Sequence, residues 1–172
     1  TEFRKVVVNK NANRGGLLTQ GTFLIGNSDG MNSHAILRGV WLSDVILNDA
    51  PPEPPKNVPP LDDSIPDFDK LTLNEKLFAH RNKAACKSCH EKIDPWGIPL
   101  ENFDASGAWR DQVLVVSKAE SGPEKAKKTN FNRDYIPIHR ESILPDKVSI
   151  DGVSELKQYL IHHRKHDFGQ GL

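Results

Sequence analysis

The sequence has no net charge, no long apolar run and few aromatic residues, and these absences exclude some classes of protein. Lysine plus arginine and aspartate plus glutamate each total 23 in 172 residues, so the formal net charge is zero. Nucleic acid is therefore not expected as a partner, because phosphate binding requires a basic excess. No apolar stretch reaches the roughly 18 residues that cross a bilayer, so no membrane span is expected in this chain.

Aromatic residues make up 7% and hydrophobic residues 37% of the chain, which is low for a self-sufficient core of this length. A buried non-protein group could supply the missing apolar volume, although long surface loops would give the same composition. The sequence starts at TEFRK without a methionine and shows no signal peptide. We interpret it as a piece of a longer protein.

Caps, turn residues and apolar periodicity predict short elements along the chain. Ser33 is the expected N-cap of a helix that reaches Leu47, and six prolines then forbid helix over residues 50–60. Thr72 and Glu75 have the spacing of a capping box for a helix over residues 71–81. The remaining predictions are a strand over 112–116, a strand-like stretch over 135–150 with a turn near Pro145, and a helix over 154–164.

Both cysteines stand in the segment AACKSCHEKIDPWG, as Cys86 and Cys89, and His90 follows directly. A redox disulfide is one interpretation, but thioredoxin-like pairs lie between a strand and a helix, and here a helix precedes the pair. Zinc is a second interpretation, but no further C-x-x-C or H-x-x-x-H pattern lies downstream. Two buried thiols beside a surface histidine would be a third. The histidines of residues 162–166 are interpreted as a solvated helix end.

Covalent attachment of haem explains all three residue types and their order. Two thiols three positions apart can add across the two vinyl groups along one edge of the ring, and the next residue then lies beneath the iron. Cys86 and Cys89 are therefore predicted to form thioether bonds, and His90 is predicted to be the proximal iron ligand. The cofactor that follows is a single covalent haem c.

The residues after the motif are predicted to form a loop that supports the proximal histidine. A metal-bound histidine usually donates its other ring N–H to a fixed acceptor, and the Pro95 carbonyl is the candidate here. Trp96, Leu100 and Phe103 are expected to wall the haem pocket.

The segment HRNKAACKSCHEKIDPWGIPLENFDASGAWR resembles the motif that joins two adjacent domains of formerly unknown function in large planctomycete cytochrome c proteins. Upstream, RGGLLTQGTFL, LRGVWLSDVIL and PPEPPKNVPP are similar to the first of these domains. Downstream, ILPDKVSIDGVSELKQYL is similar to the second. The resemblance implies one c-type haem and an extracytoplasmic location, in the periplasm or at the cell surface.

Two departures from that pattern lie near the C-terminus. Lys147 stands where the resemblance leads us to expect a glycine after Leu-Pro-Asp, and the further helix usual in the second domain does not follow before Leu172. The C-terminal lobe is therefore expected to be truncated.

The predicted fold is mainly α with a small β component: cytochrome c-like helices around one covalent haem, plus a short β hairpin. Residues 1–60 are expected to form an N-terminal lobe with a helix and the proline-rich strap. Residues 61–116 would be the haem-attachment core, and residues 117–172 a C-terminal lobe of hairpin and helix. All three are expected to form one compact unit.

The sixth coordination position of the iron distinguishes the possible functions. A protein ligand there favours electron transfer, whereas an open position admits small molecules. Met31, the only methionine, is the predicted sixth ligand, with His34, His80 and His139 as alternatives. His80 lies only six positions before Cys86, so His80 is expected to bind a haem propionate instead, together with Arg81. Arg38 and Arg110 are further candidates for that role.

The leading hypothesis is a monohaem c-type cytochrome domain that exchanges electrons with a redox partner domain or protein. It would be a module of a larger extracytoplasmic protein. The alternative is a haem site with an open distal face, which would act as a peroxidase-like enzyme or a small-ligand sensor. A peroxidase would need a distal acid or base, for which His34 or His80 could serve.

Overall fold

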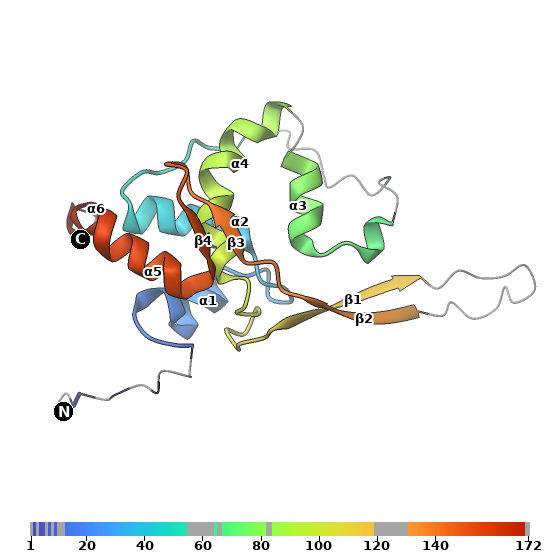
Figure 1. Cartoon of the computed structure of the whole chain (residues 1–172), viewed down its shortest axis with the longest axis horizontal. Coiled ribbons are helices and arrows are strands. Elements are labelled where there is room, and N and C mark those ends of the chain that lie inside the picture. The colour runs from blue at the N-terminus through green and yellow to red at the C-terminus, as the bar shows by residue number, and fades with distance from the viewer. Residues whose placement is uncertain are drawn as a thin grey trace, which may run out of the picture.

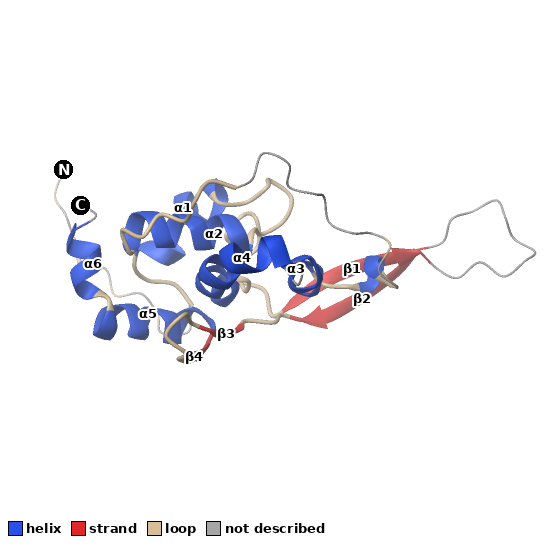
Figure 2. Cartoon of the chain, turned by 90° about the horizontal axis from the view of Figure 1, so that it is seen from above, coloured by secondary structure: helices blue, strands red, loops and turns tan. Residues whose placement is uncertain are grey.

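A computed structural model describes residues 13–54, 67–81, 84–118 and 131–170, together with six single positions outside these ranges. Helices predominate in these ranges, and the strands form two small antiparallel sheets (Figures 1 and 2). The prediction of a mainly α fold with a small β component is therefore confirmed. The part of the proline-rich strap over residues 55–60 lies outside the described residues.

Helices form at the three places where the sequence predicts them, near residues 33–47, 71–81 and 154–164, with small shifts at their ends, and further helices form where none was predicted. The α-helices are α1 (Gly21–Gly26), α2 (Ala35–Trp41), α3 (Leu73–Arg81), α4 (Ala84–Gly97), α5 (Gly152–His163) and α6 (Lys165–Gln170). The shorter helical turns are η2 (Leu17–Thr19), η4 (Phe68–Lys70) and η5 (Ile98–Leu100), and α2 continues directly into a π-helix, η3 (Leu42–Ile46).

The strands form two separate hairpin-like pairs. β1 (Gln112–Lys118) pairs with β2 (Phe131–Pro137), and β3 (Glu141–Ile143) pairs with β4 (Ser149–Asp151) across the turn predicted near Pro145. In Figure 1 the β1–β2 ribbon projects away from α1, α2 and α5 and has η4 beside β1, while β3 and β4 lie between α4 and α5. The predicted strand and turn are thus confirmed.

One core gathers side chains from both ends of the chain. It joins the first helices to the end of α4, to the segment after α4 and to the inner face of α5. Its buried members are Leu18, Phe23, Leu24, Leu42, Ile46, Leu47, Trp96, Leu100, Phe103, Leu144, Ile150, Val153, Leu156 and Tyr159. A smaller cluster of Ala35, Leu77 and Ile98 attaches α3 to α2 and η5.

Two glycines allow the backbones of α2 and α4 to touch. A Cβ atom added at Gly97 would lie 1.8 Å from the carbonyl oxygen of Ala35, and one at Gly39 would lie 2.3 Å from the carbonyl oxygen of Ile93. No side chain fits at such distances, so α2 and α4 can cross this closely only because both positions are glycine. This crossing fixes the C-terminal half of α4.

The predicted N-cap at Ser33 is wrong by one residue. His34 is the N-cap of α2, and its Nδ1 accepts a hydrogen bond of 3.3 Å from the backbone N–H of Leu37. The Ser33 hydroxyl is instead buried and donates to the Glu101 carboxylate at 2.8 Å. The Ser33 hydroxyl therefore bonds to Glu101, which is distant in the sequence, and does not cap the helix.

The predicted loop after His90 is also wrong, because α4 continues through Pro95 to Gly97. Proline lacks the N–H that would bond to the carbonyl four residues earlier. That carbonyl belongs to Glu91, an exposed residue, and only two helical residues follow Pro95. The helix therefore lacks one backbone hydrogen bond on its solvent-exposed face and keeps its contacts with α2.

The capping box of α3 is confirmed. The backbone N–H of Thr72 donates to Glu75 Oε2 at 2.8 Å, and the backbone N–H of Glu75 donates to Thr72 Oγ1 at 3.3 Å. The backbone N–H and the hydroxyl of Thr72 both donate to the Glu75 carboxylate and hold the pKa of the Glu75 carboxyl below its usual value. The capping box fixes the residue at which α3 begins, and the position of the C-terminal end of α3 follows from that start.

Lys147 occupies the position where a glycine was expected, and its φ of 73° lies in the left-handed region. Its backbone N–H donates to the carbonyl of Leu144 at 2.8 Å, which closes the turn between β3 and β4. A side chain in this conformation is strained by contact between Cβ and the following carbonyl.

We predict that Gly97→Ala lowers the free energy of unfolding by about 3 kcal/mol or more, because a backbone carbonyl blocks the new methyl group. Chemical denaturation followed by circular dichroism measures this. Gly26→Ala is the matched control, since a Cβ atom there meets nothing within 4 Å. Equal stability of the two variants would contradict the close crossing of α2 and α4.

We predict that Lys147→Gly raises the free energy of unfolding by up to about 1 kcal/mol, the relief of strain less the added entropy of the unfolded chain. Lys147→Ala removes the same charge but keeps the Cβ atom, and should give no such gain. Thermal unfolding of both variants beside the parent chain tests this. A glycine variant no more stable than the alanine variant would be evidence against a left-handed Lys147.

Candidate functional site

The helix α4 presents the motif residues along one side. Cys86, Cys89 and His90 occupy positions i, i+3 and i+4 of α4, which neighbour one another on a helix surface. All three residues are partly exposed, and both thiols are free. Two thiols and an imidazole therefore lie together where α4 reaches the surface.

His90 is oriented by a carboxylate one turn further along the same helix. Its Nδ1 lies 2.9 Å from Asp94 Oδ1, and the side chains of His90 and Asp94 are 15% and 2% exposed. The Arg81 guanidinium beside Asp94 favours the ionised carboxylate, which can only accept, so we assign Nδ1–H as the donor and Nε2 as the ring nitrogen left to bind a metal. The Pro95 carbonyl, the expected acceptor, instead accepts from Ser142 Oγ at 3.0 Å.

The Asp94 carboxylate lies between His90 of α4 and Arg81 of α3. The Arg81 guanidinium at the end of α3 lies 3.6 Å from Asp94 Oδ2, on the side away from His90. Burial raises the pKa of the Asp94 carboxyl, and the hydrogen bond from His90 and the charge of Arg81 only partly oppose that rise. The carboxylate thus couples the orientation of His90 to the packing of α3.

His80 comes next to His90 from the neighbouring helix. It lies one residue before Arg81 on α3 and is 5% exposed. The centroids of the His80 and His90 rings are 5.9 Å apart, with the ring planes at 78°. Two imidazoles separated by ten positions in the sequence therefore meet between α3 and α4.

The other predicted pocket residues lie in the main core. The Trp96 ring packs against Tyr159 of α5 with centroids 6.0 Å apart, and the Phe103 ring packs edge-on against Trp109 at 5.2 Å. Leu100 is fully buried in the same core. Arg81 contacts Asp94 and lies over the ring of Phe78, with the guanidinium carbon 4.5 Å from the ring centroid.

Met31, the predicted sixth ligand, lies in an exposed turn before α2. The Asp29 carboxylate closes this turn by accepting from the backbone N–H groups of Met31 and Asn32, at 2.8 and 2.5 Å. The Met31 residue is 88% exposed. Of the alternatives, His34 caps α2, and only His80 lies beside His90.

A polar hollow of about 430 Å³ lies away from the motif. Its lining includes His139, the third alternative ligand, together with Asn102, Asp111 and Arg140. Arg140 is bound to Asp151 through two hydrogen bonds of 2.7 and 3.1 Å. None of the residues of α4 lines this hollow, so we place the candidate site at the thiols and imidazoles rather than in the hollow.

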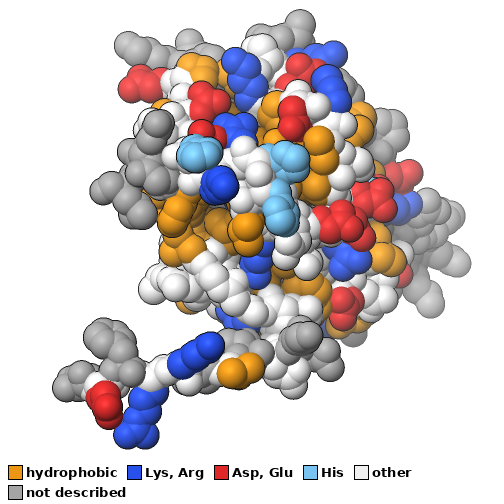
Figure 3. Space-filling model, turned by 60° about the vertical axis from the view of Figure 1, so that its left-hand side comes forward, with side chains coloured by type: hydrophobic (Ala, Val, Ile, Leu, Met, Phe, Trp, Pro, Cys, Tyr) orange, Lys and Arg blue, Asp and Glu red, His pale blue; other side chains and the backbone are white. Residues whose placement is uncertain are grey.

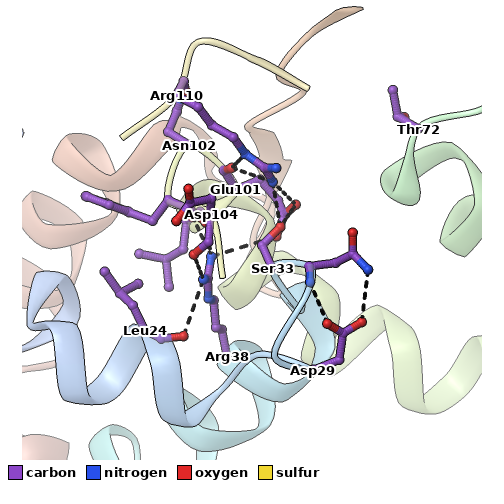
Figure 4. Close-up of polar contacts among 12 residues, drawn as sticks. Leu24, Asp29, Ser33, Arg38, Thr72, Glu101, Asn102, Asp104 and Arg110 are labelled. Atoms are coloured by element: carbon purple, nitrogen blue, oxygen red, sulfur yellow. Dashed lines mark hydrogen bonds and ion pairs between the residues drawn. The ribbon is translucent and has the colours of Figure 1, made fainter. Parts of the chain in front are cut away.

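A buried arginine joins α2 to the segment that follows α4 (Figure 4). Arg38 is fully buried and donates to the carbonyls of Leu100, Phe103 and Asp104 at 2.7 to 2.9 Å, with a longer bond to that of Leu24. Its guanidinium is therefore engaged with interior backbone, which corrects the expectation that it binds a propionate. Burial lowers the pKa of Arg38, and the charge of Glu101 partly opposes this.

Glu101 and Arg110 extend this network toward the surface. Glu101 accepts from Ser33 and lies 3.7 Å from the Arg110 guanidinium and 4.0 Å from that of Arg38. Arg110 also donates to the Ser33 hydroxyl at 2.6 Å. Burial raises the pKa of the Glu101 carboxyl. The network fixes the segment after α4 rather than contributing side chains to the motif.

Sequence reasoning missed Asp94 as the partner of His90. The signal was present, since a histidine and an aspartate four positions apart face each other on a helix. Pro95 concealed it, because a proline favours ending a helix before its own position. The buried Arg38–Glu101 network had no comparable signal, because its members lie 63 positions apart in the sequence.

The histidines near the C-terminus lie apart from this site. His162, His163 and His166 are exposed, and the His163 ring stacks on Tyr159 with centroids 4.9 Å apart. Figure 3 shows histidine and basic side chains together on the face that contains the α5–α6 end of the molecule. In the ranges that the structure describes, no three histidine, cysteine or acidic side chains are arranged to hold a metal ion.

The residues of α4 fit a covalently attached haem in their chemistry. Thioether formation requires two reduced thiols, and both cysteines are free and partly exposed. Iron ligation requires a neutral imidazole nitrogen, and the Asp94 hydrogen bond at Nδ1 leaves Nε2 for that role. The two thiols and the imidazole are therefore of the chemical kind that a covalent haem would require.

Comparison with known proteins gives one match. The family PSCyt3, described as "Protein of unknown function (DUF1588)", matches residues 14–113, more than half of the chain. No curated protein and no solved structure matches. As for membrane insertion, none of the helices in the described ranges has the length and apolarity needed to cross a bilayer.

Proposed function

The chain belongs to the PSCyt3 family, and from this premise we propose that it is a monohaem c-type cytochrome module that transfers electrons. The family name points to a cytochrome-related module, whereas its description assigns no function. The observation that carries the proposal is the hydrogen bond between His90 Nδ1 and Asp94, on the same helix as two free thiols. When bound, haem would supply a one-electron iron couple.

Cys86 and Cys89 would attach the cofactor. Each thiol adds across one vinyl group: a carbon–sulfur bond forms at one vinyl carbon, and the thiol hydrogen ends on the other. The reaction joins two molecules without oxidising or reducing either, so it requires no co-substrate. Both thiols lie on one side of α4, at positions i and i+3, so a single helical turn can present them to the same edge of the ring.

His90 and Asp94 would set the affinity of the site for the two oxidation states. A carboxylate that accepts from Nδ1–H increases the electron density on Nε2, which favours the more positive ferric iron. Asp94 is 2% exposed and is itself held by Arg81, so the acceptor cannot turn away to water. This arrangement favours a potential lower than a backbone carbonyl acceptor would give.

The motif lies at the surface, which suits exchange of electrons with a partner. Cys86, Cys89 and His90 are partly exposed, and their neighbours Lys87, Glu91 and Lys92 are exposed. We infer that the partner is a redox domain or protein that docks near the start of α4. The extracytoplasmic location implied by the sequence resemblance is part of the same proposal.

The experiment that tests the proposal is intact-mass analysis of the chain expressed in a host with haem-ligation machinery. We expect one added haem on the parent chain, retained after denaturation in acid. Cys86→Ala together with Cys89→Ala should abolish the covalent adduct, while Ser88→Ala, between them, should leave it unchanged. A parent chain that carries no covalent haem would overturn the cytochrome assignment.

We predict that Asp94→Asn raises the midpoint potential of the haem-loaded chain, because an amide is a weaker acceptor for Nδ1–H. A tenfold change in the relative affinity for the two oxidation states corresponds to about 60 mV in a one-electron couple. Spectroelectrochemical titration measures the shift. Asp44→Asn, at an exposed position of η3, controls for the lost charge. An equal shift in both variants would assign the effect to net charge instead.

A further inference from the structure

The His80 ring lies beside the His90 ring, and this contact suggests a role for His80 in the site. The rings lie in contact, with centroids 5.9 Å apart, although α3 and α4 are separate helices. Both residues belong to helices anchored by other contacts, so their proximity follows from the packing of α3 on α4. A second imidazole beside the proximal histidine raises the question of what that pair can hold.

The separation of the rings matches that of two imidazoles bound to one metal atom. A metal–imidazole bond of about 2 Å places the ring centroid about 3 Å from the metal, so two opposed ligands have centroids about 6 Å apart. A distal acid or base acting on a bound small molecule would stand roughly 3 Å further away, because the ligand and a hydrogen bond must fit between. The observed 5.9 Å agrees with direct ligation.

We propose that His80 is the second axial ligand of the haem iron, opposite His90; this inference rests on the proposed cytochrome function. It replaces Met31, which lies 88% exposed in a turn closed by Asp29. It also gives His80 a role other than binding a propionate. The site would then be a bis-imidazole centre without an open coordination position, which is the arrangement of an electron carrier rather than a peroxidase.

Contacts at both ends of α3 fix the position of His80. The Thr72–Glu75 capping box sets the start of the helix, and Leu77, one turn before His80, is buried against Ala35 and Ile98. At the other end Arg81 lies 3.6 Å from the Asp94 carboxylate that orients His90. The Asp94 carboxylate therefore contacts both Arg81 of α3, the helix that carries His80, and His90 itself on α4. The same contacts thus position both imidazole rings.

The test uses the haem-loaded chain and reads the ligands of the iron directly. We expect the parent chain to be low-spin in both oxidation states and not to bind carbon monoxide. His80→Ala should lose the low-spin ferric signal in electron paramagnetic resonance and gain carbon monoxide binding, and added imidazole should restore the low-spin signal. Met31→Ala and His34→Ala, matched controls at the other candidate positions, should keep the spectrum of the parent chain.

The outcomes separate this assignment from the cytochrome proposal. A parent chain without covalent haem would defeat the cytochrome proposal itself, whereas a haem-loaded His80→Ala that stays low-spin would overturn only the role of His80. A switch to high spin in Met31→Ala would also overturn it. If His80→Ala does not mature, the near-infrared charge-transfer band of the ferric parent chain decides, because bis-imidazole and imidazole–thioether ligation give bands at different energies.

Discussion

Direct contact between the backbones of α2 and α4 is the constraint on which the rest of the structure depends. At Gly39 and Gly97 a backbone carbonyl of the other helix occupies the space that a Cβ atom would need, so no side chain fits at either position. Arg38, the residue before Gly39, then reaches the carbonyls of the segment after α4. The C-terminal half of α4 is thereby fixed in the interior, and its N-terminal half, with the two thiols, extends to the surface.

The polar interior of this region makes the arrangement specific rather than simply stable. A buried charge is costly unless it is paired and hydrogen-bonded. Arg38 meets both conditions, through interior carbonyls and through Glu101 at 4.0 Å. The carbonyls lie in position only when the segment after α4 follows its observed path. Any other path would leave the guanidinium or the carbonyls without partners, so the network selects one conformation.

Much of the fold could be predicted from the sequence where a local signal and the tertiary contacts agree. The Thr72–Glu75 box, the Pro145 turn and the strand over 112–116 are of this kind, and the structure contains each of them. The predictions failed where a distant partner outweighed the local preference. Ser33 left the N-cap for Glu101, and packing of Gly97 on α2 kept Pro95 inside a helix.

The candidate site divides in the same way. Cys86, Cys89 and His90 lie within five residues of the sequence, so their types and spacing alone lead to the haem hypothesis. Asp94 could have been found from its spacing, had the helix been expected to continue past it. The meeting of His80 with His90 could not, because it depends on how α3 packs against α4, and no pattern within either helix determines that angle or distance.

This division has a consequence for how such a chain would mature. The thiols and the imidazole of α4 lie in one continuous segment, so under the proposed function an unfolded polypeptide would already contain the residues that attach the cofactor. The second imidazole, that of the proposed ligand His80, would come into place only after α3 packs against α4. The absorption spectrum and the spin state of the iron would therefore differ between a newly modified, unfolded chain and the folded protein. Both properties would indicate when folding is complete.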